Sequence, residues 1–354
     1  MIKLSCPACS APFEAPDDDS PTVTCSYCGN SFARPGVTRN PRSDTAAGLA
    51  VGAIALVIGI IGAGVIAWYA LRNVRTNAPP MPDAPSITAP SPNEHPETQL
   101  ATRTLTIGEK GEGPARFDDN RTVAVDPAGR IYTAEYDAGR LQVFDADGKF
   151  LTQWPIGDER VVLDLVADRA GHLYLLNPQQ ITVYDTATGS VARTLVDVHA
   201  SDLCLTLDNR VLALDESGSV FQVSDGDHPE PIVTGLAART GVKNVRFERF
   251  AIDARGDLLL TDRMTPRVFR FSSTGQYLDR FEATGLSNLN GIAVDGLGRI
   301  FVSSVSGIGV YSAEGQRLGS VDIRQAFGIV FSDTGDLFVA ARPTVVKFRM
   351  ANTK

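Results

Sequence analysis

The chain has 354 residues, with 33 Lys and Arg against 41 Asp and Glu and a formal net charge of −8 at pH 7. This length predicts more than one domain. The composition argues against a nucleic-acid-binding protein, because arginines in the C-terminal part are interleaved with Asp and Glu and leave no one-sided positive excess for phosphate. We therefore expect no nucleic-acid partner.

Residues 1–35 carry two Cys-x-x-Cys pairs, Cys6 with Cys9 and Cys25 with Cys28, at zinc-ribbon spacing. Four thiolates complete a tetrahedral, structural zinc site with no open position. In so small a module the metal would supply most of the folding energy, on the order of 10–16 kcal/mol. The segment resembles short bacterial zinc-ribbon modules, and one structural Zn²⁺ is the predicted cofactor. The alternatives are two disulfides or a redox pair.

Residues 45–72 form an apolar run, "TAAGLAVGAIALVIGIIGAGVIAWYALR", without charge before Arg72. A helix of this length crosses a bilayer with some tilt, and Trp68 and Tyr69 suit its interfacial belt. We expect one transmembrane helix rather than a buried soluble helix or a cleaved signal peptide. Gly48 and Gly52 form a small-residue step that favours a homodimer seam.

Residues 73–99 are rich in proline, which predicts an extended, disordered linker. Basic residues are slightly more numerous before the apolar run than after it, which favours an N-terminus inside the cell. Four of the five cysteines lie in the N-terminal module, where the thiolates must stay reduced. We therefore expect a single-pass protein of the cell membrane, with the ribbon cytoplasmic and the C-terminal domain outside.

Residues 100–354 contain a repeated pattern of short strands and turns. The clearest copy is "VDPAGRIYTAEYDAGRLQVFDADGKFLTQW", where runs rich in Val, Ile, Phe, Tyr and Thr favour strands and Asp and Gly mark the turns. The copies recur about every 40 residues, which is typical of the four-stranded blades of a β-propeller. Their anchor positions are Asp126, Asp168, Asp208, Asp253, Asp295 and Ser332. The sixth copy lacks a fourth strand, and Thr102–Ile107 is expected to supply it and close the ring.

The segment "GIAVDGLGRIFV", which begins at Gly291, resembles the NHL repeat, as does "GEGPARF" from Gly111. The resemblance implies an all-β, six-bladed propeller. The family's Asp-x-x-Asn-x-Arg loop corresponds to Asp262 and Arg267 in the fourth copy, and to Glu135 and Arg140 in the first. NHL propellers include protein-binding modules, RNA binders, sensor domains and a few lyases, and related six-bladed propellers include lactonases, so the fold does not decide the function.

The loops between the second and third strands of each copy emerge on the same face as the connections that join the blades. We predict that this face binds the ligand, because its side chains are free of the strand ladder. Tyr136 and Arg267 are the expected anchors, since aromatic and Arg side chains dominate binding hot spots. The predicted ligand-binding residues are Glu135, Tyr136, Asp137, Asn177, Asp215, Asp262 and Arg267.

Two functions follow from these residues. The first is a non-enzymatic binding, sensing or scaffold protein whose propeller engages a protein, peptide or glycan, without catalytic residues. The alternative is a metal-dependent hydrolase similar to the lactonases, in which Glu135, Asn177 and either Asp215 or Asp262 hold a divalent ion in the central channel. The same acids also fit a purely local role, as hydrogen-bond acceptors within their own loops.

Overall fold

The computed structural model describes residues 2–5, 12–15, 22–24, 31–33, 100–156, 161–223 and 228–351. The chain divides into two compact units, Met1–Pro90 and Ser91–Lys354. In the described ranges, no helix is both long and apolar enough to span a bilayer. The predicted transmembrane helix at 45–72 and the linker at 73–99 lie outside these ranges.

The described strands of the first unit form two antiparallel hairpins. Strand β1 (Ile2–Ser5) pairs with β2 (Pro12–Ala15), and β3 (Thr22–Thr24) pairs with β4 (Ser31–Ala33). The last pairs before the two connections are Ser5 with Pro12 and Thr24 with Ser31. Each Cys-x-x-Cys pair therefore belongs to the segment that joins the strands of one hairpin. The four cysteines themselves are outside the described residues.

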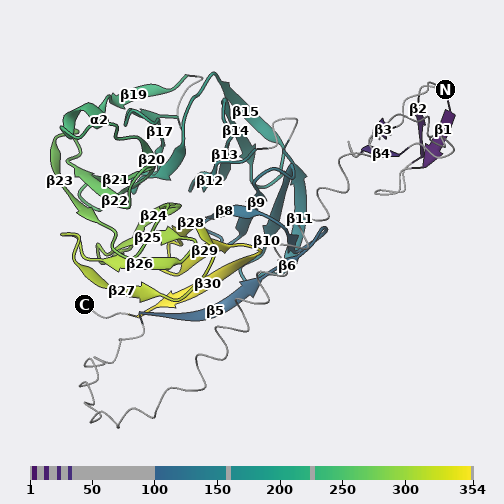
Figure 1. The fold of residues 1–354 in the computed structure, drawn as a ribbon. Coiled ribbons are helices and arrows are strands. Elements are labelled where there is room, and N and C mark those ends of the chain that lie inside the picture. Colours follow the sequence, from purple (N-terminus) through teal and green to yellow (C-terminus); the bar gives the residue numbers. More distant parts are fainter. Residues whose placement is uncertain are drawn as a thin grey trace, which may run out of the picture. The chain divides into compact units, whose positions relative to one another are not determined.

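The second unit forms a ring of six four-stranded antiparallel sheets, the blades (Figure 1). The strands of each blade are given from the innermost outward. Blade 1 consists of β8 (Asn120–Val125), β9 (Ile131–Glu135), β10 (Arg140–Phe144) and β11 (Phe150–Pro155). Blade 2 consists of β12 (Asp164–Ala167), β13 (His172–Leu176), β14 (Gln180–Asp185) and β15 (Val191–Val196), and blade 3 consists of β16 (Asp202–Leu205), β17 (Val211–Leu214), β18 (Val220–Gln222) and β19 (Glu230–Val233). The six-bladed, all-β architecture expected from the repeats is confirmed.

Blade 4 consists of β20 (Phe247–Ile252), β21 (Leu258–Asp262), β22 (Arg267–Phe271) and β23 (Tyr277–Glu282). Blade 5 consists of β24 (Gly291–Val294), β25 (Ile300–Ser304), β26 (Gly307–Tyr311) and β27 (Arg317–Val321). Blade 6 consists of β28 (Ala326–Phe331), β29 (Leu337–Ala341), β30 (Thr344–Met350) and β5 (Ala101–Ile107). Two short strands precede blade 1, β6 (Glu109–Lys110) and β7 (Arg116–Phe117), and they pair in parallel. One helical turn, α2 (Leu236–Arg239), joins blade 3 to blade 4.

The ring closes through its N-terminal strand. Strand β5 pairs antiparallel with β30, from Ala101 opposite Met350 to Ile107 opposite Val345. The outer edge of blade 6 is thereby covered by a segment far away in the sequence, and the expected closing strand is confirmed with one more residue at its start. Gly328 on β28 is needed for the innermost strands to meet here, since a Cβ at this position would lie 2.8 Å from the carbonyl oxygen of Arg121 on β8.

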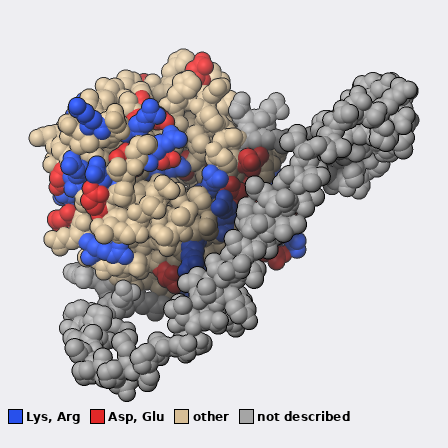
Figure 2. All heavy atoms as spheres, in the orientation of Figure 1, with Lys and Arg blue, Asp and Glu red and all other residues tan. Residues whose placement is uncertain are grey.

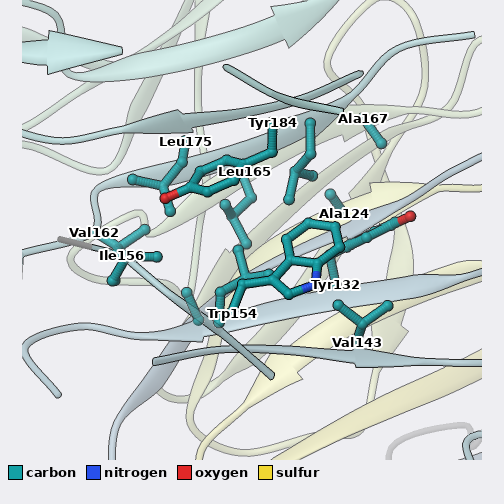
Figure 3. Close-up of a cluster of buried hydrophobic side chains, with 13 residues drawn as sticks. Ala124, Tyr132, Val143, Trp154, Ile156, Val162, Leu165, Ala167, Leu175 and Tyr184 are labelled. Atoms are coloured by element: carbon teal, nitrogen blue, oxygen red, sulfur yellow. The ribbon is translucent and has the colours of Figure 1, made fainter. Parts of the chain in front are cut away.

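The hydrophobic core consists of six clusters, each between two neighbouring blades, so every blade buries both faces against others like itself. Figure 3 shows the cluster between blades 1 and 2, where Trp154 stacks on Tyr184 with ring centroids 5.7 Å apart. Gly189, with φ of 72°, makes room for the indole, because a Cβ there would lie 2.4 Å from Trp154 Nε1. A single blade could not bury these side chains alone, which explains why the repeats occur together.

The turns between first and second strands are fixed by one side chain each. The Oδ1 atoms of Asp126 and Asp295 accept hydrogen bonds from the backbone four residues later, at 2.9 and 2.8 Å. Asp168 and Asp253 do the same, and Ser332 uses its hydroxyl. The anchor predicted in the third copy, Asp208, is wrong by two residues. Thr206 holds that turn through its hydroxyl, because the innermost strand ends at Leu205.

Candidate functional site

The six innermost strands surround a central channel that contains a cavity of about 540 Å³. We call the end of the channel where these strands begin the loop face, because the loops between second and third strands and the blade connections lie there. The opposite end, formed by the turns between first and second strands, is the turn face. A cavity of this size matches the range of small-molecule sites, about 300–1,000 Å³.

The predicted residues of blade 1 lie on the loop face, but Glu135 is buried. Its carboxylate accepts a hydrogen bond from Asp118 N at 2.8 Å and forms an ion pair with Arg140. This pair joins the acid and the arginine of the NHL-type loop within one blade. Asp137 is exposed, whereas Tyr136 is half-buried. Glu135 therefore braces its own loop.

The predicted residues of blades 2, 3 and 4 are also engaged locally. Asn177 is buried and donates to Val161 O at 2.5 Å. Asp215 accepts from the backbone N–H groups of Ser217 and Ser219 within its own turn. The carboxylate of Asp262, 4% exposed, accepts from Met264 N and from the Thr265 hydroxyl.

Arg267 pairs with Glu282 on the outermost strand of blade 4, at 2.7 Å, instead of with Asp262. None of the seven predicted residues lines the central cavity, and they come from four different blades. The structure thus places them on the expected face but does not gather them at one point.

A different cluster lies beside the channel mouth, where blades 6 and 1 meet. Arg121 makes a bidentate ion pair with Asp119 at 2.7 and 2.9 Å, and Arg342 binds the same carboxylate at 2.8 Å. The guanidinium of Arg121 stacks on Tyr136, 3.9 Å from the ring centroid. We call Asp119, Arg121, Tyr136, Phe327 and Arg342 the mouth cluster.

Phe327 completes this cluster, with its ring 5.3 Å from the guanidinium carbon of Arg121 and 5.2 Å from that of Arg342. The side chains of both arginines are about one-third exposed, at 34% and 33%, so the cluster is rigidly held and yet accessible. The two guanidinium groups hold the pKa of Asp119 below its usual value, despite the opposing effect of burial. The cluster therefore keeps its charges at neutral pH.

A second charged group lines the wall of the channel. Asp164 and Asp202 occupy the first positions of β12 and β16, and Arg249 extends from β20. Arg249 Nη1 donates to Leu163 O and Ser201 O, both at 3.2 Å, and to Asp202 Oδ1 at 3.0 Å. We call Asp164, Asp202 and Arg249 the channel triad.

Both carboxylates of the triad also link neighbouring blades. Asp164 Oδ2 accepts from Leu203 N at 3.0 Å, and Asp202 Oδ2 accepts from Phe250 N at 2.8 Å. Burial raises the pKa of Asp164, and burial together with the charge of Asp164 raises the pKa of Asp202 well above its usual value. Burial likewise raises the pKa of the nearby Cys204 thiol to about 12, so this cysteine is no thiolate nucleophile at neutral pH.

A divalent ion does not fit the residues predicted to hold it. Glu135, Asn177, Asp215 and Asp262 are bonded within their own loops or to the neighbouring blade connection, as described above. Within the described ranges, no three His, Cys, Asp or Glu side chains gather as a metal-ligand set. The oxygen atoms that do converge in the channel, from Leu163, Ser201 and Asp202, are already bound to one nitrogen of Arg249. The guanidinium thus occupies the place that a metal cation would take.

Sequence reasoning missed most of both clusters. Arg342 follows the end of β29 by one residue, as Tyr136 follows the end of β9, so the two occupy equivalent positions in adjacent blades. Asp164 and Asp202 share the first position of their strands in the same way. These equivalent positions would have been found by aligning the six copies by strand position instead of by their Asp-Gly turns.

On the face that Figure 2 shows, positive and negative side chains are interspersed.

Comparison with known proteins gives a partial match to NHL repeats. No family model matches the chain. It is 46% identical over 48 residues to NHL repeat-containing protein 3 of Homo sapiens, and likewise to that of Mus musculus. This match covers 13% of the chain and only 14% of each relative's length.

Solved structures resemble the second unit more broadly. A gluconolactonase from Xanthomonas campestris is 16% identical, with a TM-score of 0.56, and the match covers 71% of this chain and 99% of the other. A streptogramin B lyase is 12% identical, with a TM-score of 0.53, over 70% of this chain and 98% of the other. At such low identity these likenesses concern the fold alone. Together, the comparisons and the strand order show a six-bladed β-propeller with at least one segment similar to an NHL repeat.

Proposed function

We propose that this protein is a non-enzymatic binding or sensing protein of the cell membrane, whose propeller engages a protein, peptide or glycan through its loop face. The observation that supports this best is the mouth cluster. It combines two arginines and two aromatic rings, the residue types that dominate binding hot spots, in a fixed and partly exposed arrangement. Arginines stacked on rings lose little side-chain entropy when a ligand binds.

The charge of the mouth cluster indicates what kind of contact it makes. Arg121 and Arg342 share the single carboxylate of Asp119, while Asp137 lies near Arg121 but is exposed. Both guanidinium groups retain exposed area beside a polar loop surface. A ligand with carboxylate or hydroxyl groups and an apolar face suits this arrangement better than a purely apolar one, because buried guanidinium groups require acceptors.

The cysteine pairs support a structural zinc site in the first unit. The paired ends of both hairpins bracket segments that contain one Cys-x-x-Cys each. This is the arrangement in which two turns each supply two thiolates to one tetrahedral ion. We propose that Cys6, Cys9, Cys25 and Cys28 hold Zn²⁺, that residues 45–72 anchor the chain in the membrane, and that this helix forms a homodimer seam.

Partner capture tests the binding proposal. The full-length chain, purified in detergent and immobilised, is exposed to an envelope extract from the source organism, and captured partners are identified and then titrated. The double variant Tyr136→Ala, Arg342→Ala is expected to lose about 2 kcal/mol or more, roughly thirty-fold in affinity, if both are hot spots. Arg267→Ala is expected to have a smaller effect, because Glu282 already binds its guanidinium.

The matched control is Arg255→Ala. Arg255 is also an ion-paired arginine, bound to Asp253, but it lies on the turn face and its side chain is 67% exposed. It should leave the affinity unchanged. Equal affinity of the double variant and the wild type would contradict a role for the mouth cluster. Metal-dependent turnover of a lactone panel that a chelator abolishes would favour the hydrolase alternative instead.

A further inference from the structure

The arginines of the mouth cluster have more positive charge and more donors than the cluster itself uses. Arg121 and Arg342 share the single carboxylate of Asp119. Each guanidinium offers five N–H donors. Within the described residues, Arg121 donates only from Nε and Nη2, and Arg342 only from Nη1 and Nη2. Arg121 Nη1 and Arg342 Nε make no hydrogen bond there, and neither nitrogen is buried. The cluster can therefore donate to one more acceptor group.

The acids beside the mouth cluster do not fill this place. Asp119 already accepts three hydrogen bonds from the two arginines. Glu135 is occupied by Arg140. Asp118 and Asp137 are exposed and form no ion pair with a described residue, although Asp137 lies near Arg121. Solvent and salt screen exposed charges of this kind. An anionic group from a ligand would find two accessible guanidinium groups that are already held in position.

Gln325 connects the mouth cluster to the loops of blade 5. Its Oε1 atom accepts from Arg342 Nη2 at 3.1 Å, and its backbone N–H donates to Val305 O at 2.9 Å. Val305 belongs to the loop between β25 and β26, and its side chain is 38% exposed. Leu286, in the connection from blade 4 to blade 5, is half-buried. Accessible aliphatic surface thus follows directly after the second guanidinium.

This side of the loop face is also poor in charge. Residues 283–290 and 305–306 contain no Asp, Glu, Lys or Arg. The next connection, residues 322–325, adds one acid and one arginine, Asp322 and Arg324, which are both exposed. Between blades 3 and 4, by contrast, Arg246 and Arg263 share Glu216 in a more exposed arrangement, with arginine side chains at 63% and 50%. The mouth cluster is therefore the arginine pair that adjoins a neutral, partly apolar surface.

The aromatic rings of the cluster favour a peptide over a glycan. A sugar would need an open aromatic face for its apolar side. Here Arg121 covers a face of Tyr136, and Phe327 lies beside both guanidinium groups. The apolar group that remains exposed nearby is the aliphatic side chain of Val305. A carboxylate with an aliphatic side chain next to it, as a peptide provides, matches both parts of this surface.

We propose that the mouth cluster binds a carboxylate of a peptide, and that the apolar side chain next to this carboxylate lies over Val305. The inference rests on the proposed function and deepens it, because it names the group that the loop face recognises. Arg121 and Arg342 donate to the ligand carboxylate through charge-assisted hydrogen bonds, while Asp119 holds both arginines in place. The carboxylate is that of the peptide's C-terminus or of an Asp or Glu side chain, which present the same chemistry.

Three pools of short, fluorescently labelled peptides with random neutral sequences test this on the full-length chain in detergent. The first pool has a free C-terminus, the second is amidated and carries one Glu, and the third is amidated and has no acid. The first or the second should bind about tenfold more tightly than the third, and their order identifies the source of the carboxylate. Equal affinities of all three pools, or binding of none, would overturn the proposal. Tighter binding of an oligomeric uronic acid than of every peptide pool would assign the site to a glycan instead.

Two variants locate the contact. Arg342→Gln should weaken binding of the preferred acidic pool by about tenfold and leave the acid-free pool unchanged. Val305→Asp changes an exposed side chain and should also weaken the acidic pool, because it places a like charge beside the carboxylate. The matched control Arg263→Gln also removes an arginine that shares its acid, and it should change nothing. Equal losses for all pools in Arg342→Gln would refute a carboxylate contact.

This result can be told apart from a failure of the proposed function. If the double variant Tyr136→Ala, Arg342→Ala loses its captured partner while the three peptide pools bind equally, only the carboxylate inference is wrong. If that double variant captures its partner with wild-type affinity, the role of the mouth cluster in binding is wrong as well.

Discussion

Replacement of Arg249 by methionine tests whether the guanidinium is the internal cation of the channel. Methionine keeps much of the length of the side chain but removes its charge and all five donors. In the variant, the carbonyl groups of Leu163 and Ser201 lose their shared donor, and the buried carboxylate of Asp202 faces the half-buried one of Asp164 without a counter-ion. Removing one partner of a buried ion pair costs about 3–5 kcal/mol.

The size of this loss should depend on pH, and the sign follows from the direction of the pKa shifts. The pKa values of Asp164 and Asp202 are raised in the folded protein, so the folded state binds more protons than the unfolded state above pH 3.8. Stability therefore falls as pH rises from 3.8 through the raised values. Without Arg249 the shift becomes larger, and Arg249→Met should cost more at pH 8 than at pH 5.

Urea unfolding of the full-length chain at both pH values measures the effect. The matched control is Arg255→Met, which removes an exposed ion pair and should cost no more than about 1 kcal/mol. Asp202→Asn should cost less than Arg249→Met at pH 8, since it leaves one carboxylate with one guanidinium. If Arg249→Met costs the same at pH 5 and pH 8, or no more than Arg255→Met, the account of the channel triad is refuted.

Three further predictions concern the rest of the chain. Cys25→Ser should remove one of four thiolates and lower the zinc content of the purified, chelator-free protein from about one ion per chain; a wild-type content near zero would exclude zinc. A chain that starts at Gly111 lacks β5 and should aggregate, because the edge of β30 is then unpaired, whereas a chain that starts at Gln99 should stay monomeric; equal melting temperatures would contradict closure by β5. Protease added to intact spheroplasts should cut the linker at 73–99 and release the propeller, and protection of the linker would reverse the predicted topology.

The fold was predictable because its information is local and repeated. Asp and Gly mark the turns, as in Asp126 to Gly129 of blade 1. The strands between successive turns then give the number of strands in each blade. The closing strand at Thr102–Ile107 was predicted because the sixth copy of the repeat lacks a fourth strand. The error at Asp208 arose because Thr206 performs the same turn bond with a hydroxyl, which a search for acids overlooks.

The site was harder to predict because it depends on the curvature of the ring. Asp164, Asp202 and Arg249 belong to three successive blades, and only closure of the ring brings their side chains to one wall of the channel. The residues chosen from the sequence, such as Glu135 and Asp262, are polar groups at strand ends that satisfy their own loops. Residue type alone does not distinguish an acid that braces a loop from one that faces the channel.

The antiparallel pairing of β5 with β30 also has a mechanical consequence. Strand β30 begins at the loop face, so β5 ends there at Ile107 and begins at the turn face, where Leu100 O accepts from Ala351 N. Leu100, the first described residue of the second unit, therefore lies on the side opposite the mouth cluster. A pull between a ligand held at the loop face and the preceding chain would draw β5 along its own axis. Such shear loads all the hydrogen bonds of the closing ladder together instead of opening them one by one, so the closure resists tension.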